Sequence, residues 1–245
     1  AMSAFYQDFK LGVLGGGQLG RMMIQSAIDF NIDVHVLDPD PNAPCKNIAT
    51  TFQSGALTDF DTVYQFGKSC DLITIEIENV NTAALLKLQS EGKKVFPQPE
   101  VIKLIQNKLH QKQFYTKNGI PTSPFIPTAN KDEVMSQKDF LPFVNKLETE
   151  GYDGRGVQVI MSEQELEKAF EAPSFVEQLV DFEVEIGVIV ARNEKGEIRS
   201  YPTVEMAFHP EKNLVEYLFS PATLEKDIEK KAQEISATII EKLDM

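Results

Sequence analysis

The chain has 245 residues, 42% of them hydrophobic and 25% charged, which predicts a folded globular protein with one large domain or two smaller ones. Its formal net charge of −13 argues against nucleic acid or an anionic membrane as the main partner, because both bind clustered Lys and Arg. No apolar run approaches the roughly 20 residues of a membrane helix, and the two distant cysteines, Cys45 and Cys70, predict a reduced, cytoplasmic protein without disulfides.

The first predicted elements are a buried strand, a glycine turn and a helix. The strand covers residues 10–14, glycines with G-x-G-x-x-G spacing fall within 15–20, and a helical pattern covers 21–27. A second strand over 34–37 ends in Asp38, close to where a nicotinamide-binding fold places its ribose-binding acid. An NAD-dependent oxidoreductase is therefore one interpretation. The same turn serves any phosphorylated ligand, because free N–H groups at a helix N-terminus bind whatever carries the negative charge.

Strands and helices continue to alternate up to residue 98. Strands are predicted over 50–53, 71–75 and 94–96, and helices over 60–66 and 82–90. This alternation predicts a doubly wound α/β domain. Glu76 and Glu78 follow the strand 71–75, and such sheets bind their ligands at the carboxyl ends of their strands. Glu78 is thus a candidate for binding an amine or cationic group, with a solvated acid as the alternative.

After residue 98 the pattern changes to a mixture of helices and antiparallel strands. Helices are predicted over 100–106, 108–117, 130–138 and 164–170, and strands over 142–146 and 157–160. The helix 164–170 follows Ser162–Glu165, which has the form of a capping box. Lys108, Lys112 and Lys117 are predicted to lie on a solvated helix face.

The loop over residues 151–156 contains three glycines and stands between two predicted antiparallel strands. Glycines let backbone N–H groups approach an anion closely, and the planar guanidinium of Arg155 suits phosphate or carboxylate. Tyr152 and Asp153 add a phenol and a carboxylate, which a simple turn does not require. The loop therefore predicts a phosphate-binding site, with a solvated hairpin turn as the alternative.

The remaining residues predict four strands and a closing helix. The strands are 174–180, 183–190, 199–208 and 214–219, and the helix covers 224–243. Apolar residues recur at helical spacing along that helix, which indicates a core-facing stripe.

Several motifs, taken in order, resemble one known family. GGGQLGRM follows the first strand, LDPDPNAP follows the second, and NKLHQKQF, GYDGRG and VEQLVDFEVEI come later. Over essentially the whole chain this order resembles the 5-(carboxyamino)imidazole ribonucleotide synthases, ATP-grasp enzymes of purine biosynthesis. The resemblance implies a pre-ATP-grasp domain over 1–98, an ATP-grasp lid subdomain over 99–172 and the first part of the larger subdomain over 173–245. It also implies a homodimeric ligase that joins 5-aminoimidazole ribonucleotide to bicarbonate using ATP, through carboxyphosphate.

The same resemblance assigns roles to individual residues, with Glu185 as a buried acid on the nucleotide ribose. The ATP-binding positions that it implies are Lys108, Lys146, Gly151, Gly154, Gly156, Glu177, Gln178, Leu179, Val180, Glu185 and His209. The positions beside bicarbonate and carboxyphosphate are Tyr152, Asp153 and Arg155. The positions facing the ribonucleotide are Gly17, Gln18, Leu19 and Glu78.

Two departures from the family pattern bear on activity. Glu148 and Glu150 stand beside the glycine loop, where the family usually has basic or small residues, and they would repel ATP if they pointed inward. The family's Mg²⁺ ligands lie on later strands and are expected beyond Met245, so the chain resembles a truncated and inactive enzyme. A non-catalytic nucleotide-binding fragment is therefore a further alternative.

Overall fold

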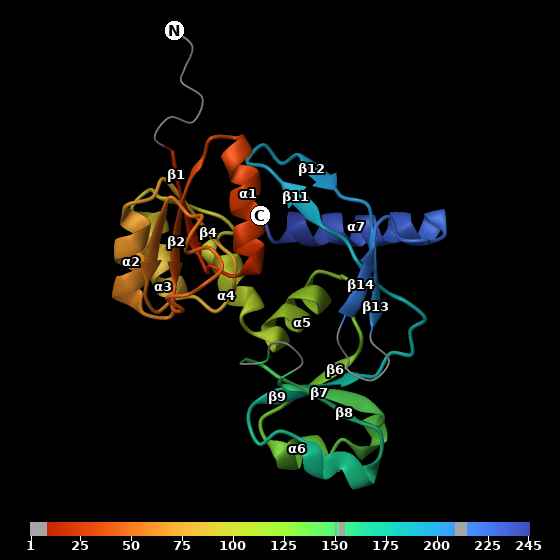
Figure 1. Ribbon diagram of the computed structural model, residues 1–245. Coiled ribbons are helices and arrows are strands. Elements are labelled where there is room, and N and C mark those ends of the chain that lie inside the picture. Colours follow the sequence, from red (N-terminus) through yellow and green to blue (C-terminus); the bar gives the residue numbers. More distant parts are fainter. Residues whose placement is uncertain (1–8, 150, 152–154, 209–214) are drawn as a thin grey trace. The chain divides into compact units, whose positions relative to one another are not determined.

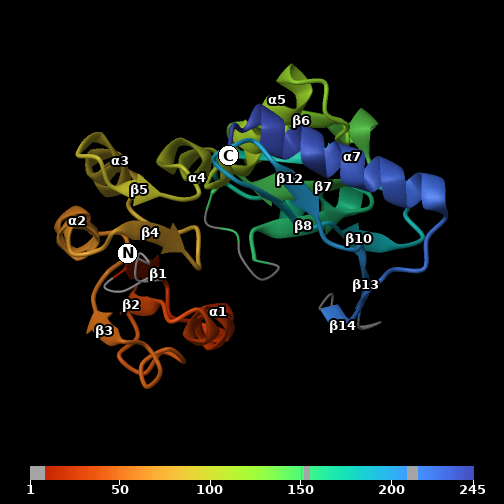
Figure 2. The ribbon, with the colours of Figure 1, turned by 90° about the horizontal axis from the view of Figure 1, so that it is seen from above.

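The computed structural model describes residues 9–149, 151, 155–208 and 215–245. The chain forms two compact units, 1–106 and 107–245, and Figure 1 and Figure 2 label their helices and strands where there is room. The predicted division into 1–98, 99–172 and 173–245 stays a prediction, and residues 99–106 lie in the first unit.

The first unit is the predicted doubly wound α/β domain. Its elements are β1 (Lys10–Leu14), α1 (Gln18–Asp29), β2 (Asp33–Asp38), β3 (Thr51–Ser54), α2 (Phe60–Lys68), β4 (Leu72–Ile75), α3 (Thr82–Ser90), β5 (Lys94–Val95) and α4 (Pro99–Ile105). The five strands form a parallel sheet in the order β3-β2-β1-β4-β5. The chain therefore reverses its direction of winding at β1, and the carboxyl end of β1 carries the glycine turn.

Apolar side chains on both faces of this sheet are buried, as is typical of a parallel sheet that helices cover on both sides. Val13 packs with Ile24 of α1 on one face, whereas Leu14 belongs to a core with residues of α2 and α3 on the other. Figure 2 shows α1 on one side of the sheet and α2 and α3 on the other. Cys45 and Cys70 are both buried and free, one in each core.

The second unit begins with an antiparallel sheet and short helices. These elements are α5 (Lys108–Lys117), β6 (Phe125–Thr128), α6 (Lys131–Met135), η1 (Lys138–Phe140), β7 (Phe143–Leu147), β8 (Val157–Ile160), η2 (Glu163–Lys168) and β9 (Ser174–Gln178). The sheet order is β6-β9-β7-β8, so the strand before the glycine loop, β7, lies between β8 and β9. Phe143, Ile160 and Val176 form the centre of its core.

The rest of the second unit consists of β10 (Glu185–Gly187), β11 (Val190–Arg192), β12 (Ile198–Ser200), β13 (Val204–Phe208), β14 (Val215–Phe219) and α7 (Lys226–Lys242). Strands β10, β13 and β14 form one antiparallel sheet, and β11 and β12 form a separate hairpin. Helix α7 contacts β11 and β12.

The prediction of unbroken strands over 183–190 and 199–208 is wrong. Gly187 pairs with Val204 and Val190 pairs with Ser200, so two residues on one strand face three on the other. Pro202 is one of the three, and it cannot donate to a ladder because it has no N–H group. The bulge therefore divides one long hairpin into two short sheets.

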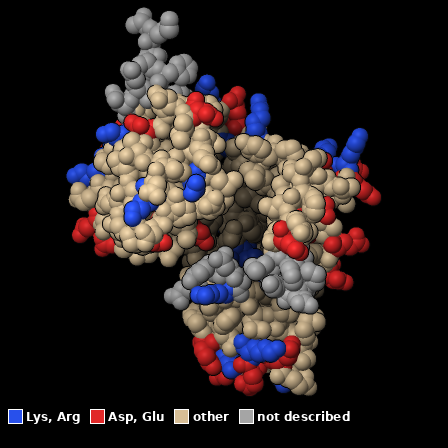
Figure 3. Space-filling model, in the orientation of Figure 1, with Lys and Arg blue, Asp and Glu red and all other residues tan. Residues whose placement is uncertain are grey.

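The helix predicted over 164–170 is also wrong in type. The structure has a 3₁₀ helix, η2, in which Ser162 makes no side-chain capping bond. Glu165 instead accepts a bond from the N–H group of Met161, at 2.8 Å. Around α6 and η2, acidic and basic side chains alternate in ion pairs such as Lys138 with Glu163, and Figure 3 shows this mixture in red and blue.

Candidate functional site

A buried carboxylate between two lysines marks the candidate site in the second unit. The Oε1 atom of Glu177, on β9, lies 2.5 Å from Nζ of Lys146, on β7. Its Oε2 atom lies 2.6 Å from Nζ of Lys112, on α5. Only 11% of the Lys112 side chain, 13% of Glu177 and 28% of Lys146 is exposed, so Lys146 is the member of the group that reaches solvent most.

Glu177 is ionised in this arrangement. Burial opposes the charge most strongly and raises the pKa of the carboxyl group, but the hydrogen bonds and positive charges of Lys112 and Lys146 outweigh it and hold the pKa below its ordinary value of 4.5. Two ammonium groups and one carboxylate leave a net positive charge at this point. This lysine cluster, made up of Lys112, Lys146 and Glu177, is therefore suited to an anionic ligand.

The prediction that Lys112 is solvated is wrong. Its residue is only 8% exposed, and its ammonium group also bonds to Thr122 Oγ1 at 2.6 Å and to Ser123 O and Oγ at 3.0 Å. Lys112 lies four residues after Lys108 and three after the buried Leu109, so the helical period places it on the inner face of α5. That spacing is the signal that sequence reasoning overlooked.

The two ends of the glycine loop meet closely. The N–H group of Leu147 donates to the carbonyl oxygen of Gly156 at 2.9 Å, and Lys108 Nζ donates to the carbonyl oxygen of Gly151 at 2.5 Å. A Cβ atom on Gly151 would lie 2.6 Å from Lys108 Nζ, and one on Gly156 would lie 2.8 Å from the Cα atom of Gly151. Gly156 also has a φ of 71°, which L side chains rarely adopt. Glycine is therefore required at both ends of the loop, and Lys108 lies at its entrance.

Glu148 does not face the lysine cluster with a free carboxylate. Its Oε2 atom accepts a bond from Nδ2 of Asn107 at 3.0 Å, and its carbonyl oxygen accepts from the N–H group of Lys108 at 2.8 Å. Asn107 in turn caps α5 by accepting from the N–H group of His110. Glu148 thus supports the N-terminus of the helix that carries both Lys108 and Lys112. Glu150 lies outside the described residues.

Residues 177–180, which the family resemblance implies contact the adenine of ATP, begin in β9. The strand ends at Gln178, two residues earlier than predicted, and Leu179 and Val180 follow it as a non-strand segment in which Val180 is 53% exposed. Glu185 begins β10 and is exposed, so the expectation of a buried ribose acid is wrong. The physical reason is local, since the residues 181–184 ahead of it are exposed as well.

Of the other residues expected at the site, the structure describes only Arg155. Arg155 is exposed just before β8. Tyr152, Asp153, Gly154 and His209 lie outside the described residues.

In the first unit, the glycine turn is surrounded by carboxylates. Asp38 accepts bonds from the N–H groups of Gly16 at 2.6 Å and Asp40 at 2.7 Å, one with each oxygen. Glu76 lies on the other side, where its carboxylate oxygens stand 2.7 Å from the position of a Cβ atom on Gly15 and 2.6 Å from one on Gly17. Asp38 therefore holds the turn together, and both of its oxygens are engaged by the backbone.

The expected ribonucleotide-binding side chains of this unit lie near the ends of its elements. Gln18 and Leu19 open α1, and both are exposed, Leu19 by 69%. Glu78 is exposed after β4, and its carbonyl oxygen accepts a bond from Nε2 of Gln106 at 2.7 Å. The structure thus leaves Gln18, Leu19 and Glu78 accessible to a ligand within the first unit.

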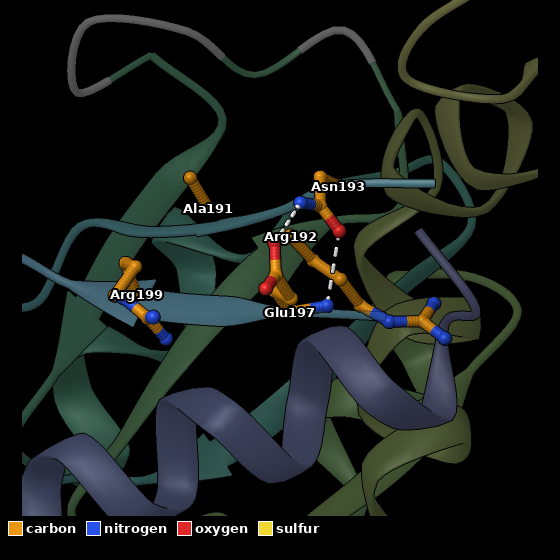
Figure 4. Close-up of a pocket in the computed structure, with 5 residues that line it drawn as sticks. All are labelled: Ala191, Arg192, Asn193, Glu197 and Arg199. Atoms are coloured by element: carbon orange, nitrogen blue, oxygen red, sulfur yellow. Dashed lines mark hydrogen bonds between the residues drawn. The ribbon is translucent and has the colours of Figure 1, made fainter. Parts of the chain in front are cut away.

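Hollows occur elsewhere in the second unit. One of about 230 Å³ lies at the β11–β12 hairpin and is lined by Ala191, Arg192, Asn193, Glu197 and Arg199 (Figure 4). Polar side chains that line this hollow already form hydrogen bonds within the chain. Asn193 Nδ2 donates to Glu197 at 2.6 Å, and Arg192 donates to the carbonyl oxygen of Met245 at 2.7 Å. It shares no residue with the lysine cluster, and we assign it a structural role. A second hollow, of about 330 Å³, is lined by Leu147, Glu148, Thr149, Ala172 and Pro173, beside the start of the glycine loop.

Among the residues that the structure describes, no group of three or more His, Cys, Asp or Glu side chains is arranged to hold a metal ion. None of the described helices is long and apolar enough to cross a membrane.

Two family models match consecutive parts of the chain. Residues 9–106 match the ribonucleotide synthetase preATP-grasp domain, and residues 113–245 match the ATP-grasp domain. The two matches correspond to the two compact units of the structure.

Individual proteins are similar over most of the chain. The phosphoribosylaminoimidazole carboxylase of Candida glabrata is 37% identical over 234 residues, which are 91% of this chain and 40% of that protein. The N5-carboxyaminoimidazole ribonucleotide synthase of Synechococcus elongatus is 32% identical over 96% of this chain and 60% of that protein. The crystal structure of N5-carboxyaminoimidazole synthase from Aspergillus clavatus, in complex with ADP and 5-aminoimidazole ribonucleotide, is 33% identical with a TM-score of 0.84, over 96% of this chain and 62% of that one. The chain thus spans between 40% and 62% of the length of these relatives.

Proposed function

Because this chain belongs to the ATP-grasp family, with a ribonucleotide synthetase preATP-grasp domain before the ATP-grasp domain, we propose that it acts in the ATP-dependent carboxylation of 5-aminoimidazole ribonucleotide. Bicarbonate is the carbon donor, and the reaction belongs to purine biosynthesis. The related proteins named for this chemistry and the bound ribonucleotide of the Aspergillus clavatus structure support the choice of substrate.

One observation carries the proposal: the buried Glu177 carboxylate holds Lys146 beside the strand that leads to the adenine segment. ATP would place its adenine along 177–180, its ribose near Glu185 and its phosphates at Lys146 and Lys108. The glycine loop 151–156 would cover the phosphates with its backbone N–H groups. His209 completes the proposed nucleotide site.

The proposed reaction has two steps. A bicarbonate oxygen attacks the γ-phosphorus of ATP, the bond to the β,γ-bridging oxygen breaks, and carboxyphosphate and ADP form. The amine of the ribonucleotide then attacks the carboxyl carbon, loses a proton and expels inorganic phosphate. Tyr152, Asp153 and Arg155 would lie beside these reacting groups, and Gly17, Gln18, Leu19 and Glu78 would hold the ribonucleotide.

Mg²⁺ belongs to the proposal only through the family resemblance, which places its ligands beyond position 245. The described residues offer no fitting group of ligands, so no step is assigned to them through the metal. A preparation of residues 1–245 alone is expected to bind ATP without releasing ADP. The proposal also includes a homodimer and a cytoplasmic location, as the resemblance implies.

The test measures ADP formation by the protein that carries this chain, with and without bicarbonate and the ribonucleotide. ADP release that requires both compounds is expected, and release that ignores the ribonucleotide would contradict the proposal. Arg155→Ala is expected to lower kcat roughly a hundredfold, because a guanidinium beside the γ-phosphate stabilises charge that develops in the transition state. The KM for the ribonucleotide should change much less. Arg199→Ala, an exposed arginine of β12, serves as the matched control.

A further inference from the structure

Lys112 has no hydrogen available for a ligand. An ammonium group has three N–H donors. Around Lys112 stand Glu177 Oε2 at 2.6 Å, Thr122 Oγ1 at 2.6 Å, and Ser123 O and Oγ at 3.0 Å. Its Nζ also lies 5.4 Å from the centre of the Phe125 ring, whose face favours a cation. Lys112 is therefore saturated by protein groups and fixed in place.

Lys146 is the opposite case. Within the described part of the chain its ammonium group has one acceptor, Oε1 of Glu177, so two of its donors remain for a ligand. Its side chain is 28% exposed, against 11% for Lys112. The two lysines that share one carboxylate thus differ in which of them a phosphate can reach.

We propose that Lys112 is a positioning residue of the nucleotide site: it neutralises one side of Glu177 from within the protein, so that the carboxylate orients Lys146 without cancelling its charge toward a phosphate. The inference rests on the proposed function and deepens it, since Lys112 itself touches no nucleotide.

The charge balance explains the expected effect. With Lys112 present, the group of three side chains has a net charge of about +1, and a phosphate is attracted to it. Without Lys112, the buried carboxylate would have Lys146 as its main counter-ion, the net charge would be about zero, and Lys146 would be drawn toward Glu177. The phosphates, and not the adenosine, would lose binding energy.

The test compares Lys112→Met with Lys112→Arg and with Lys117→Met, an exposed lysine on the same helix. Binding of ATP, tripolyphosphate and adenosine is measured for the 245-residue chain by NMR titration. Lys112→Met should weaken ATP and tripolyphosphate about tenfold and leave adenosine unchanged. Lys112→Arg should recover most of this loss, since it restores the positive charge beside Glu177. Lys117→Met should bind like the parent chain.

A second measurement follows the Glu177 carboxyl group itself by ¹³C NMR. In Lys112→Met its titration should move to higher pH, because burial, which raises its pKa, is then opposed by one lysine and not two. An unchanged titration overturns the inference whatever the nucleotide results. Equal weakening of adenosine and ATP also overturns it, because that pattern indicates a general loss of structure. If the parent chain binds tripolyphosphate but neither ATP nor adenosine, the proposed function fails, while a tenfold loss of tripolyphosphate binding in Lys112→Met still supports the role of Lys112.

Discussion

The chain contains two glycine-rich segments, 15–20 and 151–156, and their surroundings have opposite charge. The first lies between the carboxylates of Asp38 and Glu76. Asp38 accepts from the N–H group of Gly16, and Glu76 fills the space beside Gly15 and Gly17. The second has Lys108 at its entrance, and Lys146 lies on the strand that leads into it. Glycine spacing alone makes both segments candidates for binding phosphate.

The difference shows that the charges around a glycine turn, more than its glycines, decide what it binds. In the first turn an internal carboxylate, Asp38, already accepts from the N–H group of Gly16, which a phosphate would otherwise use. In the second, a carboxylate is also present, but Glu177 is shared between two lysines and leaves an excess of positive charge. An anion is therefore expected at the second segment. In the first segment, 15–20, Asp38 is expected to have a structural role. A ligand there is expected to bind through groups other than the Asp38 carboxylate and the N–H group of Gly16.

The largest expected effect tests the structural side of the comparison. Asp38→Ala removes the acceptor of two charge-assisted bonds from Gly16 and Asp40, and we expect unit 1 to lose about 2–3 kcal/mol of stability. Hydrogen exchange of the β1 and β2 amides measures this loss. ATP affinity should stay the same.

Asp40→Ala is the control for that variant. Asp40 is an exposed neighbouring acid that accepts one bond, from the N–H group of Asn42. Its removal should cost about 1 kcal/mol or less. The comparison breaks if Asp38→Ala weakens ATP binding while leaving β1 and β2 fully protected.

The next effect tests the binding side. Lys146→Ala removes the exposed member of the lysine pair, and ATP binding should weaken about tenfold, which corresponds to about 1.4 kcal/mol. Calorimetric titration measures the affinity. Lys138→Ala, which removes an equally charged but surface-paired lysine from the same unit, should leave it unchanged. Equal affinities for the parent chain and Lys146→Ala would remove the reason for assigning the phosphates to this cluster.

Much of the fold follows from local sequence pattern. The alternation of apolar strands and amphipathic helices predicts the first unit because the central strands β1 and β2 have buried side chains on both faces and each helix has them on one. The hairpin over 185–208 was harder to predict, since its interruption depends on how Pro202 is registered against the opposite strand. Strand register depends on both paired segments, so it cannot be predicted from the sequence of either one alone.

The candidate site was predictable to a different extent. The family motifs pointed to Lys146, Glu177 and the glycine loop, but the charge pairing that connects them was not visible. Lys112 looks like any helical lysine until β9 brings Glu177 next to it, 65 positions away in number but 2.6 Å away in space. Glu185 shows the opposite error. It was expected to be buried because the family resemblance gives it a role at the nucleotide ribose, although its neighbours in the sequence are exposed, as Glu185 itself is.

The smallest expected effect concerns the acid beside the glycine loop. If Glu148 repelled ATP, then Glu148→Gln would raise the affinity for ATP severalfold, and the effect would fade with added salt. The structure predicts otherwise: the carboxylate is bonded to Asn107 at the N-terminus of α5, and a glutamine oxygen can accept the same bond. ATP affinity should therefore change by less than about twofold at low and at high salt, a difference below about 0.4 kcal/mol. Glu148→Ala should have a larger effect on ATP affinity than Glu148→Gln, because it removes the bond to Asn107 and loosens the helix that carries Lys108 and Lys112. A rise in affinity for the glutamine variant alone, limited to low salt, would show that the negative charge of Glu148 does reach the phosphates.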